Sequence, residues 1–172
     1  MTFRLGQLSE SKLEYVDTGV AACVRRAITL TAQDFAVFEG LRDIERQKKL
    51  FASGASRTLN SYHLADKYGL SHAVDLVPYI DGRQQWQDVP AVRVAEAMHR
   101  AACDLDVELT WGGVFDRPLR LLDRKALESE IEAYVARWRR AHPRPADHVG
   151  YWGPLVDRPH FQGVREQLAL AA

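Results

Sequence analysis

Residues 60–78 read NSYHLADKYGLSHAVDLVP, and the rest of the chain is organised around this stretch. It contains four potential metal ligands: His63, Asp66, His72 and Asp75. Its second half, residues 73–77, predicts a buried strand of small, β-branched and aliphatic residues with Asp75 at its centre. A buried carboxylate is unfavourable unless a cation offsets its charge. We therefore infer that this strand holds a metal ion.

A complementary group lies near the other end of the chain, where residues 157–161 read DRPHF. A catalytic zinc site needs three protein ligands of the His and Asp or Glu type and an open position for water. It also needs a nearby carboxylate that accepts the proton of that water. His63, Asp75 and His160 would supply the three ligands. Asp157, separated from His160 by a rigid proline, would then be the base.

Size, charge and cysteine content narrow the class of protein. A chain of 172 residues that is 47% hydrophobic suits one compact domain. Its 23 basic and 23 acidic residues cancel, which argues against binding to nucleic acid or an anionic membrane through a basic field. Cys23 and Cys103 lack CxxC spacing, so we expect two small buried residues and neither a disulfide framework nor a cysteine metal site.

The amino terminus, MTFRLGQLSESK, has no continuous apolar segment and no small-residue cleavage site, so no secretion signal is visible. No apolar run approaches the roughly 18 to 20 residues that span a bilayer. We therefore expect the protein to fold in the cytoplasm without stable membrane insertion. A substrate beyond the inner membrane would require another factor that lets the protein through.

Periodicity predicts the order of helices and strands. Apolar residues at three- and four-residue spacing predict helices over 9–28, 88–104 and 123–141. A cap at Asp43 and a stop at Ser53-Gly54 predict a helix over 43–51, and residues 164–172 form a predicted helical tail. Alternation and β-branched content predict strands over 34–39, 73–77, 107–111 and 156–162. Asp81-Gly82 predicts a tight hairpin. This order predicts an α+β fold, with a small, mostly antiparallel sheet flanked by helices and the metal in a cleft.

The composition changes between residues 114 and 151, where a charged helix at about 123–141 carries one apolar face. We interpret 114–151 as a helical insertion before the last strand, within a single catalytic domain of residues 1–172. An apolar face of that length needs a partner, so we expect the insertion to contribute to substrate engagement.

Four motifs occur in order along the chain. They are Ser61-Tyr62-His63, Gly69 through Ala73-Val74-Asp75, Trp111-Gly112-Gly113 and Asp157-Arg158-Pro159-His160-Phe161. This order resembles the SxH, GxAxD, WGG and DxPHF pattern of the D-Ala-D-Ala metallopeptidase superfamily. The chain most resembles its branch of phage endolysins that act as L-alanyl-D-glutamate endopeptidases. Counterparts of residues 1–10, 38–42, 53–56 and 79–82 extend the resemblance over most of the chain.

The resemblance implies a role for each residue at the site. It implies Zn²⁺ held by His63, Asp75 and His160, with Asp157 as the general base. It also places Arg42 where these enzymes carry an arginine that steadies the scissile carbonyl as it becomes an oxyanion. The chain departs from the pattern in two places, since both the gap between the first two ligands and the gap between the WGG and DxPHF motifs are enlarged.

The first departure, an insertion at about residues 64–71, leaves His72 as an alternative ligand because it is closer in sequence to Asp75. Side chains alternate along a strand, so residues 72 and 75 point to opposite faces. A histidine on the preceding segment can instead face Asp75 across a hairpin. Strand geometry therefore favours His63.

Each assignment also has a simpler explanation. Backbone N–H groups can satisfy a buried carboxylate such as Asp75, and His63 can be an ordinary loop histidine. Asp157 can be a turn residue, and Arg42 can form a surface ion pair with an acidic neighbour in sequence. The joint assignment rests on the order of the whole set.

The function that this resemblance implies is a zinc-dependent peptidoglycan endopeptidase, a phage or prophage endolysin. It would hydrolyse a stem-peptide amide bond, L-alanyl-D-glutamate, by metal-activated water. Its partner is the bacterial peptidoglycan stem peptide, with no nucleic acid, and we expect a monomer. The protein would stay in the host cytoplasm until a holin opens the membrane and would then act in the periplasm. The alternatives are a D-Ala-D-Ala carboxypeptidase or dipeptidase, and a non-catalytic zinc-containing module that binds the cell wall.

Overall fold

An antiparallel sheet forms the centre of the structure, a computed structural model that describes residues 2–145 and 154–163. The strands follow the order β1-β2-β6-β4-β5, and β3 pairs with β2. Their bounds are β1 (Phe35–Glu39), β2 (Ala73–Ile80), β3 (Arg83–Gln84), β4 (Leu109–Trp111), β5 (Val114–Pro118) and β6 (His160–Gly163). Each of these pairings is antiparallel, which confirms the predicted α+β class with its antiparallel sheet.

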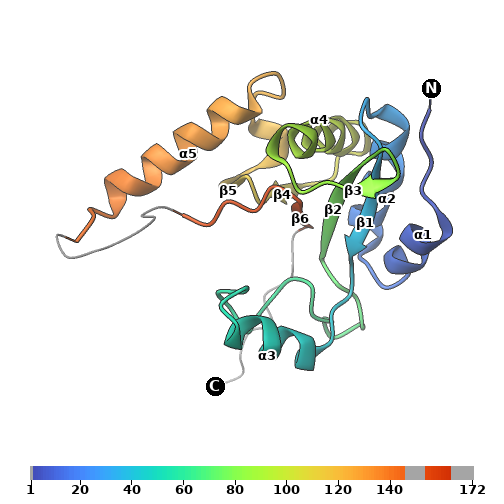
Figure 1. The fold of residues 1–172 in the computed structure, drawn as a ribbon, viewed down its shortest axis with the longest axis horizontal. Coiled ribbons are helices and arrows are strands. Elements are labelled where there is room, and N and C mark those ends of the chain that lie inside the picture. Colours follow the sequence, from blue (N-terminus) through green and yellow to red (C-terminus); the bar gives the residue numbers. More distant parts are fainter. Residues whose placement is uncertain (1, 146–153, 164–172) are drawn as a thin grey trace.

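Helices lie around this sheet. They are α1 (Gln7–Leu13), α2 (Thr18–Leu30), α3 (Ile44–Ala52), α4 (Asp88–Leu105) and α5 (Leu127–Ala141), with a 3-10 turn η1 (Leu119–Leu121). α2 and α4 pack against each other and against the sheet, and α1 lies beside β1 (Figure 1). α3 and most of α5 lie farther from the sheet (Figure 1). The predicted helical tail over 164–172 lies outside the described residues.

The two faces of the sheet differ in chemistry. Along β2, Val74 and Leu76 have no exposed surface and belong to the apolar core that includes α2 and α4. Asp75 lies between them and therefore points to the other face. Along β6, Phe161 is likewise in the core, so its neighbour His160 shares the face of Asp75. Burial of apolar side chains decides which face of the sheet packs against α2 and α4. The alternating residues Asp75 and His160 therefore lie on the opposite face.

The predicted helix over 9–28 is two helices. The chain breaks at Asp17, whose carboxylate accepts hydrogen bonds from the N–H groups of Gly19 and Val20 and so caps α2. The N–H of Asp17 donates to the carbonyl of Ser71 at 2.8 Å, which ties the break to the sheet side of the molecule. Three buried residues keep helical spacing across the break: Leu13, Val16 and Val20. Periodicity alone therefore did not reveal it.

Other bounds also differ from the sequence prediction. The last strand begins at His160 rather than at residue 156. The fifth helix begins at Leu127 rather than at residue 123, because the side chain of Asp123 accepts from the N–H of Lys125 and holds a turn there. The Asp81-Gly82 hairpin is confirmed, with φ of 51° and 74°. Both angles fall in the left-handed region that a tight two-residue hairpin requires.

The segment predicted as an insertion begins inside the sheet, because residues 114–118 form β5 and pair with β4. Beyond η1, α5 buries Leu127, Ile131 and Tyr134 against the core. Its second half extends away from the sheet (Figure 1). Residues 146–151 of the predicted insertion lie outside the described part.

Two smaller expectations concern cysteines and membranes. Cys23 is buried as expected, but Cys103 is exposed on α4, and both are free. Within the described residues, no helix combines the length and the apolar character needed to cross a bilayer.

Candidate active site

Sheet register brings two of the predicted site residues together. Asp75 on β2 lies directly opposite His160 on β6. Nδ1 of His160 is 3.0 Å from Oδ1 of Asp75. Directly opposed residues on neighbouring strands have their side chains on the same face, so the backbone ladder alone places this pair.

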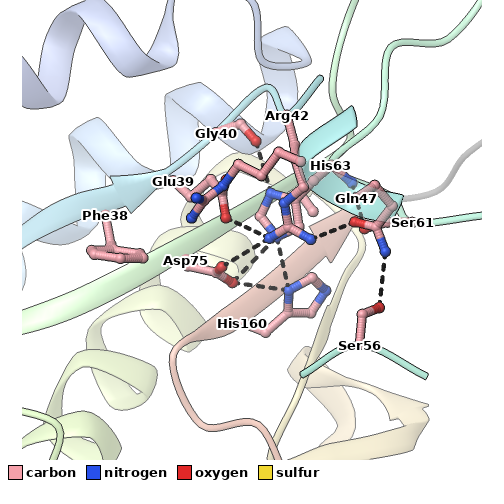
Figure 2. A network of polar contacts seen from close by, with 12 residues as sticks. Phe38, Glu39, Gly40, Arg42, Gln47, Ser56, Ser61, His63, Asp75 and His160 are labelled. Carbon is pink, nitrogen blue, oxygen red and sulfur yellow. Dashed lines mark hydrogen bonds and ion pairs between the residues drawn. The ribbon is translucent and has the colours of Figure 1, made fainter. Parts of the chain in front are cut away.

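The third predicted ligand reaches the pair from a loop. Nε2 of His63 lies 3.3 Å from Oδ1 of Asp75 and 3.2 Å from Nδ1 of His160 (Figure 2). The loop is held there by backbone contacts, because the N–H of Arg42 donates to the carbonyl of His63 at 2.8 Å. Ser61 supports the loop as well, since its Oγ accepts from the N–H of His63. One ligand atom from each of the three residues lies within 4.8 Å of the others.

The outer nitrogens of both histidines indicate what the centre of this cluster can hold. Nδ1 of His63 lies 2.7 Å from the carbonyl oxygen of Gly40, and Nε2 of His160 lies 3.0 Å from Oε1 of Gln162. Both partners accept only, so each outer nitrogen carries a hydrogen, and in the neutral imidazole each inner nitrogen presents a lone pair. Metal-bound histidines are oriented in this way. Two imidazole nitrogens and one carboxylate oxygen are also the donor set of a catalytic metal site, so these residues fit a divalent ion.

The charges in the cluster reinforce one another. Burial raises the pKa of Asp75, but hydrogen bonds from His160 and His63 outweigh it and hold that pKa well below its usual range. Burial lowers the pKa of His160, but the hydrogen bond to Asp75 and its charge outweigh it and raise that pKa. An ionised Asp75 therefore attracts a cation to the two imidazoles. A proton competes with a metal ion for these nitrogens.

Asp157 lies on the wall of the same cavity as the cluster. Burial raises the pKa of Asp157, and the negative charge of Asp75 raises it further. A carboxylate with a raised pKa is a better proton acceptor at neutral pH than an exposed aspartate. Asp157 is thus placed and tuned as a group that can accept a proton beside the cluster.

The turn that carries Asp157 and His160 is fastened by the WGG motif. Gly112 donates its N–H to the carbonyl of His160 and accepts from the N–H of Asp157, both at 2.8 Å. Trp111, which has no exposed surface, donates from Nε1 to the carbonyl of Arg158 at 2.7 Å. A Cβ at position 112 would collide with the carbonyl oxygen of Asp157, so only glycine permits this approach. The two motifs are therefore one structural unit.

Arg42 is buried beside the cluster rather than paired on the surface. Its side chain is 9% exposed, and Nη2 lies 2.5 Å from Oε2 of Glu39 and 3.7 Å from Oδ2 of Asp75. Nη1 donates to Oε1 of Gln47 at 2.7 Å (Figure 2). The Nε of Arg42 is buried without a hydrogen-bond partner among the described residues. A surface ion pair with Asp43 or Glu45 is therefore the wrong interpretation of this residue.

Sequence reasoning missed two residues that position Arg42. Glu39 binds both Arg42 and Arg46; burial raises the pKa of Glu39, but those hydrogen bonds outweigh it and keep the group ionised. Gln47 has no exposed surface and is the buried residue of α3. The only hint of its role in the sequence is that α3 has no apolar stripe, so polar contacts must fix the helix.

His72, the alternative ligand, is engaged elsewhere. Its Nε2 lies 2.9 Å from Oδ2 of Asp66, whose other oxygen accepts from the N–H groups of Tyr68 and Leu70. The enlarged segment between the first two motifs thus forms a small closed loop. The structure places His63, and not His72, beside Asp75.

The cluster opens into a cavity of about 740 Å³ whose wall contains Arg42, His63, Asp75, Asp157 and His160. Phe38 and Trp86 form an aromatic edge of this cavity, with their rings perpendicular and 4.9 Å apart. The cavity is large enough to admit a peptide segment to the cluster.

Comparison with known proteins agrees with this geometry. The family model of phage L-alanyl-D-glutamate peptidases matches residues 1–130. The chain belongs to this family. The matched range includes Arg42, His63 and Asp75 and ends before the turn that carries Asp157 and His160.

Two relatives extend the comparison. The L-alanyl-D-glutamate peptidase of Escherichia phage T5 is 30% identical over 113 residues, which cover 65% of this chain and 81% of that protein. The crystal structure of the L-Ala D-Glu endopeptidase ChiX of Serratia marcescens matches with a TM-score of 0.65 and 26% identity. That match covers 95% of this chain and 91% of ChiX, so it extends beyond the range of the family model. The predicted resemblance to this branch is confirmed.

Proposed function

We propose that this protein hydrolyses the amide bond between L-alanine and D-glutamate in the stem peptide of bacterial peptidoglycan, with zinc bound by His63, Asp75 and His160. The observation that carries the proposal is the orientation of the two imidazoles. Each has its outer nitrogen on an oxygen acceptor and its inner nitrogen beside the same carboxylate oxygen. Membership in the peptidase family supports the choice of bond.

The chemistry divides among a few residues. Zinc held by the three ligands would supply a Lewis acid that lowers the pKa of a water molecule from about 15.7 to about 7. Asp157 takes up the proton of the attacking water and later gives it to the leaving amine. Because Gly112 fastens the turn that carries both Asp157 and His160, the base is held at a fixed place relative to the ligands.

Arg42 is the second cation of the proposed site. Its guanidinium is oriented by Glu39 and Gln47, so little rotamer freedom remains to be lost during the reaction. We assign it to the negative charge that develops on the scissile carbonyl oxygen. A pre-oriented donor of this kind is worth roughly 3 to 4 kcal/mol of barrier.

The proposal includes the setting in which the enzyme works. As an endolysin, the protein would wait in the host cytoplasm until a holin opens the inner membrane, and it would then act on the cell wall as a monomer. A single catalytic domain in which α5 helps to engage the wall is part of the same proposal. The phage origin of one relative supports it.

Digestion of purified sacculi tests the proposed function. We expect soluble fragments with a new amino-terminal D-glutamate, identified by mass spectrometry, and no fragments after dialysis against EDTA unless zinc is restored. Release of terminal D-alanine alone would indicate a carboxypeptidase instead. Binding to sacculi without cleavage would indicate a wall-binding module. Full activity after complete removal of metal would contradict the proposed chemistry.

A further inference from the structure

One of the arginine side chains that line the cavity forms no ion pair within the described residues. Three arginines line it: Arg42, Arg46 and Arg57. The first two both bind the carboxylate of Glu39. Arg57 is exposed, and within the described part of the chain its side chain forms no ion pair and no hydrogen bond. A free positive charge therefore stands at the edge of the cavity that contains the metal cluster.

Arg57 also stands where two cavities meet. A second cavity, of about 460 Å³, lies between the buried side of α5, at Ile131 and Val135, and the segment of residues 154–158. Arg57 and Leu155 line both cavities. A chain that extends from the metal cluster toward α5 would therefore pass the guanidinium of Arg57.

The backbone around Arg57 is fixed although its side chain is exposed. Nε2 of the fully buried Gln47 donates to Oγ of Ser56 at 2.8 Å and to the carbonyl of Thr58 at 2.6 Å. These two residues flank Arg57 on either side. The same Gln47 accepts from Arg42 beside the cluster (Figure 2). The position of Arg57 is thus tied to the site through one buried side chain, which lowers the entropy cost of binding a ligand there.

The proposed substrate brings a matching negative charge. A glutamyl residue whose nitrogen belongs to the scissile bond has two carboxyl groups, and only one of them can continue the chain. The other remains an anion a few bonds from the reacting nitrogen. Resting on the proposed function, we propose that Arg57 binds this free carboxylate and thereby makes the enzyme select glutamate at that position. A guanidinium suits this role because its planar fork matches a carboxylate.

Two synthetic peptides test the proposal. They contain the alanyl-glutamyl bond and differ only in whether the free carboxylate is intact or converted to a carboxamide. We expect wild-type protein to prefer the acid in kcat/KM by about tenfold, the scale of one partly solvated charged hydrogen bond. Arg57→Gln should bring this ratio close to one, because kcat/KM for the acid peptide falls more than kcat/KM for the amide peptide. Arg57→Lys should retain part of the preference.

Arg93→Gln is the matched control, because Arg93 is an exposed arginine on α4 that lines neither cavity and makes no ion pair within the described residues. Its acid-to-amide ratio should equal that of the wild type. Zinc content and melting temperature of all variants should also match.

Two results would overturn the assignment of Arg57, namely an unchanged ratio in Arg57→Gln or an equal loss with both peptides. If the wild-type protein cleaves neither peptide, the proposed function itself fails and the assignment falls with it.

Discussion

The two walls of the cavity are built in different ways. On the sheet wall, Asp75 and His160 occupy opposed positions of neighbouring strands, so backbone pairing sets their distance. The loop wall consists of residues 53–72, which lie between the end of α3 and the start of β2 and form no helix or strand. Individual hydrogen bonds therefore set the positions of His63 and Arg57. Residues that touch no substrate should therefore matter more on the loop wall than on the sheet wall.

The loop wall depends on buried polar groups that a sheet does not need. Gln47 has no exposed surface and ties the loop at two points, while Gly40 offers its carbonyl to His63. A buried hydrogen-bonding group costs about 1 to 3 kcal/mol when its partner is removed. The loop wall thus gains its precision from contacts that are individually costly to lose.

The largest expected effect on kcat is at Asp157, on the turn that precedes β6. Asp157→Asn should lower kcat by about 10² to 10⁴, the usual contribution of a general base, and leave zinc content unchanged because the residue is not a ligand. Turnover of sacculi and metal analysis of the same preparation check this. Loss of zinc together with activity would mean that the base cannot be separated from the ligand on the same turn.

A pH profile of the wild-type protein tests the role of Asp157 further. Burial first, and then the charge of Asp75, raise the pKa of Asp157. Activity needs the ionised form, so kcat/KM should fall as pH drops through a value above the ordinary aspartate pKa of about 3.9. A bound divalent ion acts in the opposite direction, because its positive charge favours the ionised carboxylate. An acid limb above pH 3.9 would show that burial outweighs the charge of the ion, and a limb below pH 3.9 would show the reverse.

The next effect tests how the two motifs fit together. Gly112→Ala places a Cβ against the carbonyl oxygen of Asp157, so the turn must move. A displacement of about 1 Å at a catalytic group can cost about 10²-fold in rate, and we expect a loss in kcat of that order. Gly6→Ala is the control, because a Cβ there meets nothing within 4 Å. Wild-type activity in both variants would show that the turn tolerates movement.

A pair of glutamine substitutions compares the walls directly. On the loop wall, Gln47→Leu removes one hydrogen bond from each of Arg42, Ser56 and Thr58 and should lower the free energy of unfolding by about 1 to 3 kcal/mol. On the sheet wall, Gln162→Leu removes the acceptor of His160 and should weaken zinc binding about 10- to 100-fold. Denaturant unfolding and competition with a chelator measure the two quantities. Equal effects on both quantities in both variants would erase the distinction between the walls.

The sequence predicts the sheet wall better than the loop wall, for a physical reason. The strand around Asp75 has a local pattern of buried residues, and the Asp81-Gly82 hairpin follows from local turn chemistry, so both could be predicted. The buried role of Gln47 depends on contacts with residues 9 and 11 positions away in a loop without periodicity. No local pattern encodes such contacts. The break at Asp17 is hidden for the opposite reason, because the apolar spacing continues through it.

The same limit applies to the candidate metal ligands. Alternation along a strand points residues 72 and 75 to opposite faces and predicts His63 rather than His72, and the structure places His63 beside Asp75. It does so from a closed loop rather than from a paired strand of a hairpin. Alternation along the strand predicts which histidine faces Asp75. It does not predict the path of the loop that carries that histidine.

The smallest expected effect concerns that closed loop. Oδ2 of Asp66 accepts from Nε2 of His72 at 2.9 Å, and Oδ1 accepts from the N–H groups of Tyr68 and Leu70. The bond from His72 first, and then the N–H of Leu70, lower the pKa of Asp66 from 3.8 to about 2. A group whose pKa is lower in the folded protein stabilises it above the unfolded pKa, and this contribution disappears as pH falls through the folded value.

Asp66→Asn keeps the size of the side chain and removes its charge, so its melting temperature should lie below that of the wild type at neutral pH. The difference should change little down to about pH 4 and become small toward pH 2, since wild-type Asp66 then becomes protonated as well. Thermal unfolding of both proteins in EDTA measures this without a contribution from metal release. A difference that stays undiminished at pH 2 would mean that the loss of an acceptor oxygen, and not the loss of charge, weakens the loop between His63 and Asp75.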